Sequence, residues 1–269
     1  MGDIEDLYAS LREATRPRAL VRTAKGLARL GLSWTRPPTR VEIGVQQWRL
    51  EHPEHESRWR SRGDNFDAVG GRKIAHGRRA GSIARSMTSI RAFRAFCLPE
   101  LERLGPHGPA SFLEFGACCG TTSLTVLEAF PDCRIIAFEP MRDRTAVFDE
   151  LRRALPTGGR ITWIEDILEH HLEGVRAMVP DGLSAIYMDT NHKYPNDLWY
   201  LEHLLVDRPL LAKDGVFICD DRMHSGTRRS VSEFLRQHGR AFDYHLVAGR
   251  WAMLRPRRAY RPDHWDRPR

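Results

Sequence analysis

The stretch from Ser111 to Ser123, SFLEFGACCGTTS, constrains the fold of this chain more than any other part of the sequence. A short apolar run that contains a carboxylate, Glu114, leads into Gly116 and Gly120, and a helix is expected to start at Thr121. A strand, a glycine turn and a helix N-terminus in this order let the backbone approach a ligand closely, with free amides available to electron-rich groups. We therefore expect this turn to hold a nucleoside-bearing cofactor.

Apolar runs alternate with helical patterns after this turn. This alternation favours a doubly wound α/β fold with a parallel sheet covered on both faces. The segment 241–256, AFDYHLVAGRWAMLRP, predicts instead a β-hairpin that turns at 248–250 and closes the sheet edge. Strands are expected at 111–116, 133–138, 160–164, 183–188 and 215–219, and helices at 121–130, 142–155, 167–178, 196–211 and 227–238.

The chain divides into three expected parts. Residues 1–80 form an N-terminal extension, helical over 1–35 and irregular over 36–80, which serves either as a cap or as a dimer arm. Residues 81–255, which begin with a helix over 82–104, form the catalytic domain, and 256–269 form a basic tail.

The net charge of +7 is unevenly distributed along the 269 residues. The first 110 residues carry about +8, residues 111–249 about −6 and the last 20 about +5. Solvated helix faces explain the basic ends, and attraction to an anionic partner is the alternative. We see no RNA-binding motif, and we expect neither a membrane span nor a signal peptide. Five cysteines without C-x-x-C spacing indicate a cytoplasmic protein without a disulfide scaffold.

A second carboxylate, Glu139, ends the run CRIIAFEP. At this position a carboxylate can accept hydrogen bonds from both hydroxyls of a ribose. The dinucleotide fingerprint G-x-G-x-x-G is absent, because Gly116 and Gly120 lie four residues apart. Glu114 would repel a pyrophosphate and tolerate an ammonium or sulfonium group, so the local chemistry favours a cationic cofactor.

These motifs resemble those of the class I S-adenosylmethionine-dependent methyltransferases, over about residues 111–255. The resemblance implies a mostly parallel seven-stranded sheet with a C-terminal antiparallel hairpin. It also implies that Glu114 and the two glycines shape the methionine pocket, that Glu139 binds the ribose, that Met141 packs on the adenine and that Asp166 takes the adenine amino group. The full set of cofactor-binding residues expected from it is Glu114, Phe115, Gly116, Ala117, Gly120, Glu139, Pro140, Met141, Asp166, Ile167 and Asp189.

A second constellation pairs MDTNHKY, 188–194, with CDDRMH, 219–224. Each follows an apolar strand, so Asp189, Asp220 and Asp221 should meet at one sheet edge. Three converging carboxylates need a cation or protonation, and Mg²⁺ with oxygen ligands is the default expectation. Helix N-capping by one of the last two aspartates is the alternative.

This pair of motifs is similar to that of the metal-dependent O-methyltransferases of the catechol and macrolide-sugar types. The resemblance implies that Mg²⁺ on the three aspartates activates a small-molecule hydroxyl, with His192 as general base and Asp189 beside it. His224 is a weaker candidate base. Asp214 stands where the pattern has a glycine, and His192 matches the sugar and small-molecule branch better than the catechol branch.

Two other functions remain open at the level of sequence. A nucleic-acid or protein N-methyltransferase is disfavoured because DTNH replaces the [N/D/S]-P-P-[Y/F/W] motif of amino-methylating enzymes. A non-methylating, hydroxylase-like or binding-only member of the same fold is the other. A basic run, Arg72, Lys73, Arg78 and Arg79, is either solvated or binds an acidic acceptor.

Overall fold

A computed structural model describes residues 37–51, 90–154 and 160–257. The expected helices of residues 1–35, the basic run at 72–79 and most of the basic tail lie outside these residues. No helix among the described residues has the length and apolar character needed to cross a membrane.

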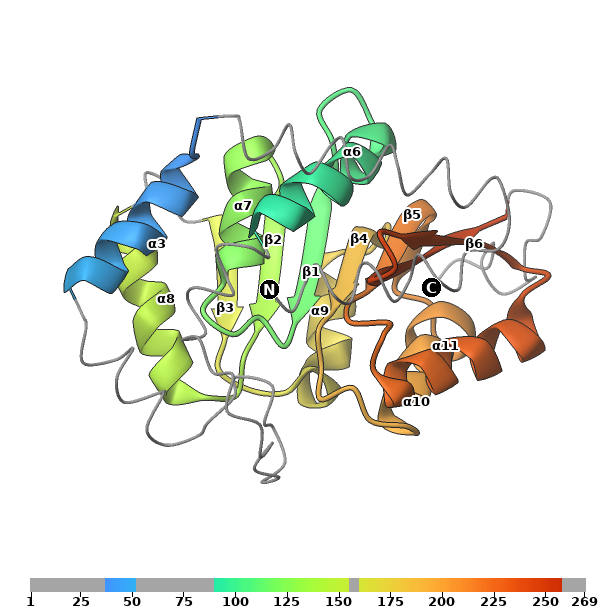
Figure 1. Cartoon of the computed structure of the whole chain (residues 1–269). Coiled ribbons are helices and arrows are strands. Elements are labelled where there is room, and N and C mark those ends of the chain that lie inside the picture. Colours follow the sequence, from blue (N-terminus) through green and yellow to red (C-terminus); the bar gives the residue numbers. More distant parts are fainter. Residues whose placement is uncertain (1–36, 52–89, 155–159, 258–269) are drawn as a thin grey trace.

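A seven-stranded sheet forms the centre of the molecule, in the order β3-β2-β1-β4-β5-β7-β6 (Figure 1). The first five strands run parallel, β7 pairs antiparallel with β5, and β6 pairs antiparallel with β7. This is the expected mostly parallel sheet with a C-terminal hairpin. The strands are β1 (Ser111–Phe115), β2 (Arg134–Phe138), β3 (Ile161–Ile164), β4 (Leu183–Met188), β5 (Leu211–Cys219), β6 (Phe242–Val247) and β7 (Trp251–Pro256).

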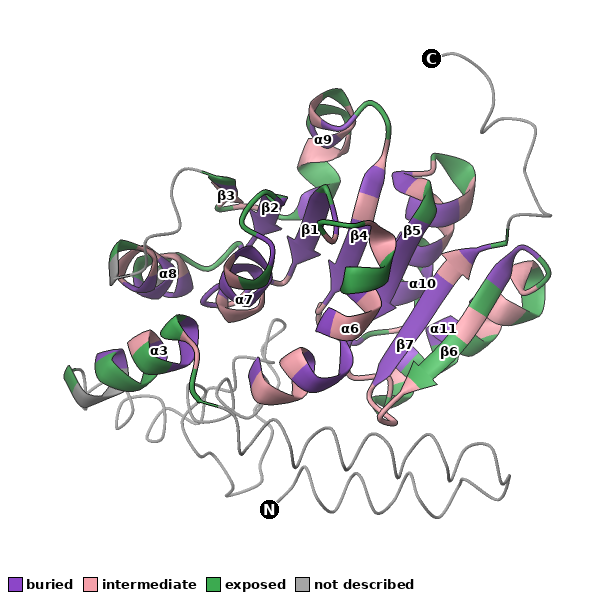
Figure 2. Cartoon of the chain, turned by 90° about the horizontal axis from the view of Figure 1, so that it is seen from above, coloured by how far each residue is buried: buried purple, intermediate pink, exposed green. Residues whose placement is uncertain are grey.

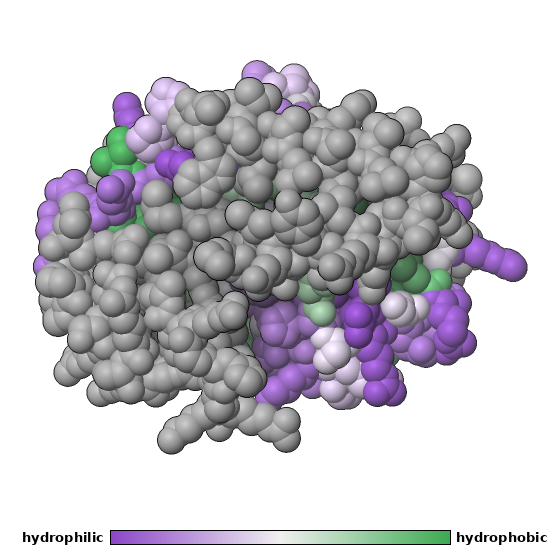
Figure 3. Space-filling model, viewed as in Figure 1, coloured by the Kyte–Doolittle hydropathy of each residue, from purple (hydrophilic) through white to green (hydrophobic). Residues whose placement is uncertain are grey.

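Helices cover both faces of the sheet because its central strands are apolar on both sides (Figure 2). One face packs against residues 90–96 and the helices α3 (Arg40–Glu51), α6 (Leu98–Leu101), α7 (Thr121–Ala129) and α8 (Arg142–Ala154). The other face packs against α9 (Leu172–Met178), α10 (Asn196–Glu202) and α11 (Ser225–His238). The outer surface of α11 is largely hydrophilic, as the lower right of Figure 3 shows.

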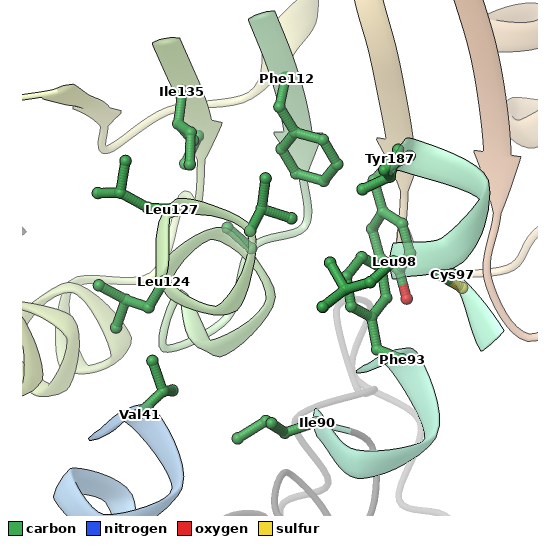
Figure 4. Close-up of a cluster of buried hydrophobic side chains, with 14 of the residues drawn as sticks. Val41, Ile90, Phe93, Cys97, Leu98, Phe112, Leu124, Leu127, Ile135 and Tyr187 are labelled. Carbon is green, nitrogen blue, oxygen red and sulfur yellow. The ribbon is translucent and has the colours of Figure 1, made fainter. Parts of the chain in front are cut away.

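The first face contains an aromatic cluster around Tyr187, whose hydroxyl donates to Asp220. The ring of Tyr187 in β4 lies between Phe112 of β1 and Phe93, with centroids 6.3 and 5.5 Å away (Figure 4). Successive strand residues point to opposite faces, so Phe112 joins this cluster whereas its neighbour Leu113 joins the core on the other side.

Several elements differ from their predicted extents. Residues 36–80 were expected to be irregular, but α3 is a helix. Thr39 and Glu42 cap its first turn reciprocally, and the carboxylate of Glu128 accepts from Arg40 N at 2.7 Å and Val41 N at 3.3 Å. The predicted helix 196–211 ends earlier, in a π-helical turn (His203–Asp207), and β5 starts at Leu211 rather than at 215. The predicted helix 167–178 divides into a 3₁₀ turn (Leu168–His171) and α9.

Candidate functional site

The carboxyl ends of the parallel strands form one continuous edge. The amide of Glu139, after β2, donates to the carbonyl of Ile164 in β3 at 3.1 Å, and those of Gly116 and Ala117, after β1, donate to Phe138 of β2. Asp189 N then donates to Phe115 O, and Asp220 N to Met188 O, at 3.0 and 2.9 Å. The two predicted constellations therefore lie side by side along this edge.

Gly116 and Gly120 are required by close approaches inside the protein. Both have positive φ, +81° and +71°. A Cβ on Gly116 would lie 1.7 Å from the carbonyl oxygen of Asp189, and one on Gly120 would lie 2.4 Å from the ring of Phe148. The turn was predicted to be glycine-rich so that a ligand can approach, and the structure shows that its own backbone and side-chain neighbours already demand glycine.

Glu114 lies buried under the turn rather than exposed to a ligand. Its Oε2 accepts hydrogen bonds from the amide of Ser123, at 2.9 Å, and from the hydroxyl of the same serine. Burial raises the pKa of Glu114 to about 8, more than the hydrogen bonds from Ser123 lower it. A largely protonated Glu114 at neutral pH does not supply the negative charge on which our argument for a cationic cofactor depended, and its part in the methionine pocket stays a prediction.

Glu139 is also buried and lies against the glycine turn. One carboxylate oxygen accepts from Cys118 N at 2.8 Å and the other from Met141 N at 3.1 Å. Arg144 of α8, which the sequence analysis did not single out, pairs with it at 3.3 Å. Burial raises the pKa of Glu139 although Arg144 opposes this shift. The carboxylate is thus fixed at the predicted ribose position, and ribose binding stays a prediction.

The residues predicted around an adenine are more open. Met141 and Ile167 are two of six large hydrophobic side chains that are exposed among the described residues. The carboxylate of Asp166 accepts the amide of Ile167 at 2.7 Å and contacts His171 and His170 at 3.0 and 3.1 Å. These contacts lower the pKa of Asp166 to about 2, so the group is ionised at neutral pH. Pro140 is exposed, whereas Phe115 and Ala117 are buried.

His192 is buried, with its two ring nitrogens in different surroundings. Its Nε2 lies 3.4 Å from Asp189 Oδ1 and 3.7 Å from Asp221 Oδ2, and it makes no hydrogen bond with any described residue. Its Nδ1 lies 3.3 Å from Thr227 Oγ1. The ring stacks on His224, with centroids 4.7 Å apart.

The backbone of His192 is left-handed, with φ of +54°, and a Cβ on Gly226 would lie 2.0 Å from its carbonyl oxygen.

A buried relay behind His192 fixes its tautomer. The hydroxyl of Thr227 donates to Asp197 Oδ2 at 2.8 Å, and that of Thr190 donates to Asp197 Oδ1 at 2.6 Å. Because the Thr227 proton points to Asp197, its oxygen can only accept from His192 Nδ1–H. In the neutral ring the lone pair is therefore on Nε2, which faces the two aspartates. Sequence reasoning missed Asp197 and Thr227, because neither stands in a motif.

The three predicted metal ligands have other partners. Both oxygens of Asp220 accept from Arg250, Nε at 2.6 Å and Nη2 at 2.7 Å, and Arg250 Nε is 3.1 Å from Asp221. Burial alone would raise the pKa of Asp220, but Arg250, together with the hydrogen bonds from Tyr187 and the amide of Asp221, holds that pKa below its usual value. Burial and the neighbouring Asp220 raise the pKa of Asp221, against Arg250. Within the described part of the chain, no group of three or more His, Cys, Asp or Glu side chains is arranged to hold a metal ion.

The cysteines beside the turn are structural. All five cysteines of the chain are free of disulfides. A contact with Cys119 and burial raise the pKa of Cys118 well above its ordinary value, which is the opposite of what a nucleophile needs.

Comparisons with known proteins agree with this fold. Residues 113–222 match a protein family described as "Methyltransferase domain". No curated protein matches the chain. A methyltransferase from Podospora anserina, PaMTH1, solved with SAH, superposes with a TM-score of 0.51 at 18% identity, over 82% of this chain and 89% of its own.

Two further structures are similar to the same extent. An O-methyltransferase from Bacillus cereus, in complex with SAH, has a TM-score of 0.51 at 12% identity and covers 81% of this chain and 91% of its own. A putative O-methyltransferase from Klebsiella pneumoniae has a TM-score of 0.50 at 15% identity, over 82% and 91%. At such identities the structures show the fold, and the sequence match adds the activity class. Together they show that the chain contains a methyltransferase domain and has the class I methyltransferase fold.

Proposed function

We propose that this protein transfers the methyl group of S-adenosylmethionine to a hydroxyl group of a small molecule. The observation that carries the proposal is His192, whose Nε2 is buried between two carboxylates at the carboxyl edge of the sheet and makes no hydrogen bond with any described residue. A base held in one tautomer suits removal of a hydroxyl proton. The names of the Bacillus cereus and Klebsiella pneumoniae proteins, both O-methyltransferases, support the same chemistry.

The residues at the ends of β1, β2 and β3 fit the cofactor. Glu139 is fixed beside the turn amides, Asp166 is ionised, and Met141 and Ile167 leave apolar surface for an adenine to cover. The structures of PaMTH1 and of the Bacillus cereus enzyme with SAH support this choice of cofactor. When bound, S-adenosylmethionine supplies an electrophilic methyl group on a sulfonium.

His192 acts as the general base in this proposal. An acceptor hydroxyl that donates to Nε2 loses its proton to the imidazole as it becomes nucleophilic. The imidazolium so formed lies 3.4 Å from Asp189 and 3.7 Å from Asp221, and both carboxylates stabilise its charge. Thr227 and Asp197 hold the ring in place from the other side.

The predicted Mg²⁺ does not fit the donor set in this arrangement. Asp220 is engaged by Arg250, and the same guanidinium also contacts Asp221. We therefore assign no step to a metal. A small-molecule acceptor of the sugar or natural-product type, rather than a nucleic acid, stays part of the proposal, as do the cytoplasmic location and pairing of two copies through the N-terminal extension.

The test has two parts. Calorimetry with S-adenosylmethionine and SAH measures cofactor binding, and mass spectrometry of a panel of phenols, hydroxylated sugars and amines finds the methylated atom. We expect His192→Asn to keep cofactor binding and lower kcat by about 10²–10⁴-fold. His245→Asn, at an exposed position in β6, is the matched control and should leave kcat unchanged. Methylation of amines alone would contradict the proposal in favour of an N-methyltransferase.

A further inference from the structure

Asp220 is saturated with hydrogen bonds. Its Oδ1 accepts from Arg250 Nε at 2.6 Å and from the amide of Asp221 at 2.7 Å. Its Oδ2 accepts from Arg250 Nη2 and from the hydroxyl of Tyr187, both at 2.7 Å. A carboxylate has about four lone-pair positions, and four donors occupy them here. The side chain is 1% exposed, so water does not compete for these positions.

The C-terminal hairpin delivers Arg250 to this place. Antiparallel pairing of β5 with β7 sets Cys219 opposite Ala252, so the chain two residues before Ala252 lies beside the end of β5. Ala248 and Gly249 have positive φ and form a tight turn, and Arg222 N donates to Arg250 O at 2.7 Å. Trp251 Nε1 donates to the Tyr187 hydroxyl at 3.2 Å, which ties the hairpin to the core cluster of Figure 4. The backbone at Arg250 and the side chain of its neighbour Trp251 are thus both held by hydrogen bonds.

We propose that Arg250 is the permanent cation of this site and takes the place of a divalent ion, so that methyl transfer proceeds without a metal. This inference rests on the proposed function. The guanidinium balances Asp220 and Asp221 and places a positive charge where a second cation would be repelled. Planar bidentate pairing of this kind is specific to arginine.

Arg250 is also a positioning residue for the base. Its Nε contacts Asp221 Oδ1 at 3.1 Å, and the other oxygen of that carboxylate lies 3.7 Å from His192 Nε2 and 3.8 Å from His224 Nε2. Arg250 therefore fixes which oxygen of Asp221 faces the imidazole, and acts on the reaction through Asp221 rather than by touching the acceptor.

The experiment is a titration of the full chain with Mn²⁺ alone, followed by calorimetry and by the electron paramagnetic resonance of free Mn²⁺. For the wild type we expect no saturable binding up to about 1 mM. Arg250→Met leaves the carboxylates without their cation and should create a site, and Arg250→Lys, which keeps the charge, should not. Arg257→Met removes an arginine that directly follows the hairpin and pairs with Asp243 in an exposed position, and this variant should behave as the wild type.

A saturable Mn²⁺ site in the wild type that Asp220→Asn removes would overturn the proposal, and so would turnover that is lost in EDTA and restored by Mg²⁺. Failure of Arg250→Met to fold would not weaken the test, because the wild-type titration decides by itself. The positioning role predicts that Arg250→Lys shifts the pH profile of kcat while KM for the cofactor is kept. Since Mn²⁺ binding needs no acceptor, this result is independent of whether the proposed O-methylation is correct.

Discussion

Glu114 in β1 and Asp220 at the end of β5 are two equally buried carboxyl groups that differ in charge: near pH 7 the first is largely neutral and the second is ionised. Their side chains are 2% and 1% exposed. Glu114 has a serine hydroxyl and an amide as donors, and its pKa rises to about 8. Asp220 has an arginine, and its pKa falls below the usual value. Burial raises both pKa values, and the partner decides the outcome.

The two carboxylates also make stability depend on pH in opposite directions. Because the folded-state pKa of Glu114 is raised, the free energy of unfolding falls as the pH rises from about 4.5 to about 8. Because that of Asp220 is depressed, its contribution is present above the unfolded pKa of 3.8 and is lost as the pH falls through the folded value. One site is therefore a structural acid that is neutral near pH 7, and the other is half of an ion pair.

The largest expected effect comes from removing Arg250, the cation that keeps Asp220 ionised. Arg250→Met leaves Asp220 buried and unpaired, so we expect the free energy of unfolding to fall by about 3–5 kcal/mol. Urea unfolding at neutral pH measures this value. The control Arg257→Met breaks a pair with Asp243 that is about half exposed on both sides, and should cost no more than about 1 kcal/mol. Equal costs for the two variants would show that Asp220 does not depend on Arg250.

The second effect tests the neutral carboxyl. Glu114→Gln removes the titration but keeps an oxygen for Ser123, so the variant should gain about 3 kcal/mol relative to the wild type between about pH 5 and about pH 8. Urea unfolding at several pH values measures the difference. Glu102→Gln, at an exposed position, should show no such trend. A constant difference between Glu114→Gln and the wild type would mean that Glu114 is ionised in the folded protein.

The third prediction concerns Asp197, a buried carboxylate that, like Glu114, accepts hydrogen bonds from hydroxyl groups. Thr227→Val removes a contact with His192 and a hydrogen bond to Asp197, whereas Thr190→Val removes a hydrogen bond to Asp197 and leaves the contact with His192 in place. We expect Thr227→Val to lower kcat by about tenfold more than Thr190→Val, because only Thr227 fixes the tautomer of the base. Steady-state kinetics with the best acceptor measures the ratio. If both variants lose the same activity, Thr227 serves packing alone.

The smallest effect belongs to the exposed carboxylate. Asp166 has a depressed pKa, like Asp220, but is solvated, so Asp166→Asn should leave the midpoint of thermal unfolding unchanged. We expect a few-fold loss of affinity for S-adenosylmethionine, seen by calorimetry. Glu165→Gln, which removes the neighbouring carboxylate paired with Arg142, is the control and should bind normally. An unchanged affinity in Asp166→Asn would remove Asp166 from the cofactor site.

Much of the architecture was predictable because it depends on local patterns. Alternating apolar runs located all five parallel strands and the hairpin, although β5 begins four residues earlier than expected, since its start, Leu211–Asp214, carries charged residues that hide the strand. The helix α3 was missed although it starts with a local capping box, in which the Thr39 hydroxyl accepts from the amide of Glu42 and the Glu42 carboxylate accepts from the amide of Thr39; its second cap, Glu128, lies 88 residues away from Arg40.

The sequence by itself determined where the chemistry lies. Strand ends place Glu139, Asp189, His192 and Asp220 along one edge, and the order of apolar and polar residues suffices for that inference. Only the tertiary structure decided which partners these groups have. Arg250 is 30 residues from Asp220 and Thr227 is 35 residues from His192 in the sequence, and no periodicity connects them. The protonation state of a buried group depends on its partner across space, and that partner is chosen by the packing of the sheet and its hairpin rather than by neighbours in the chain.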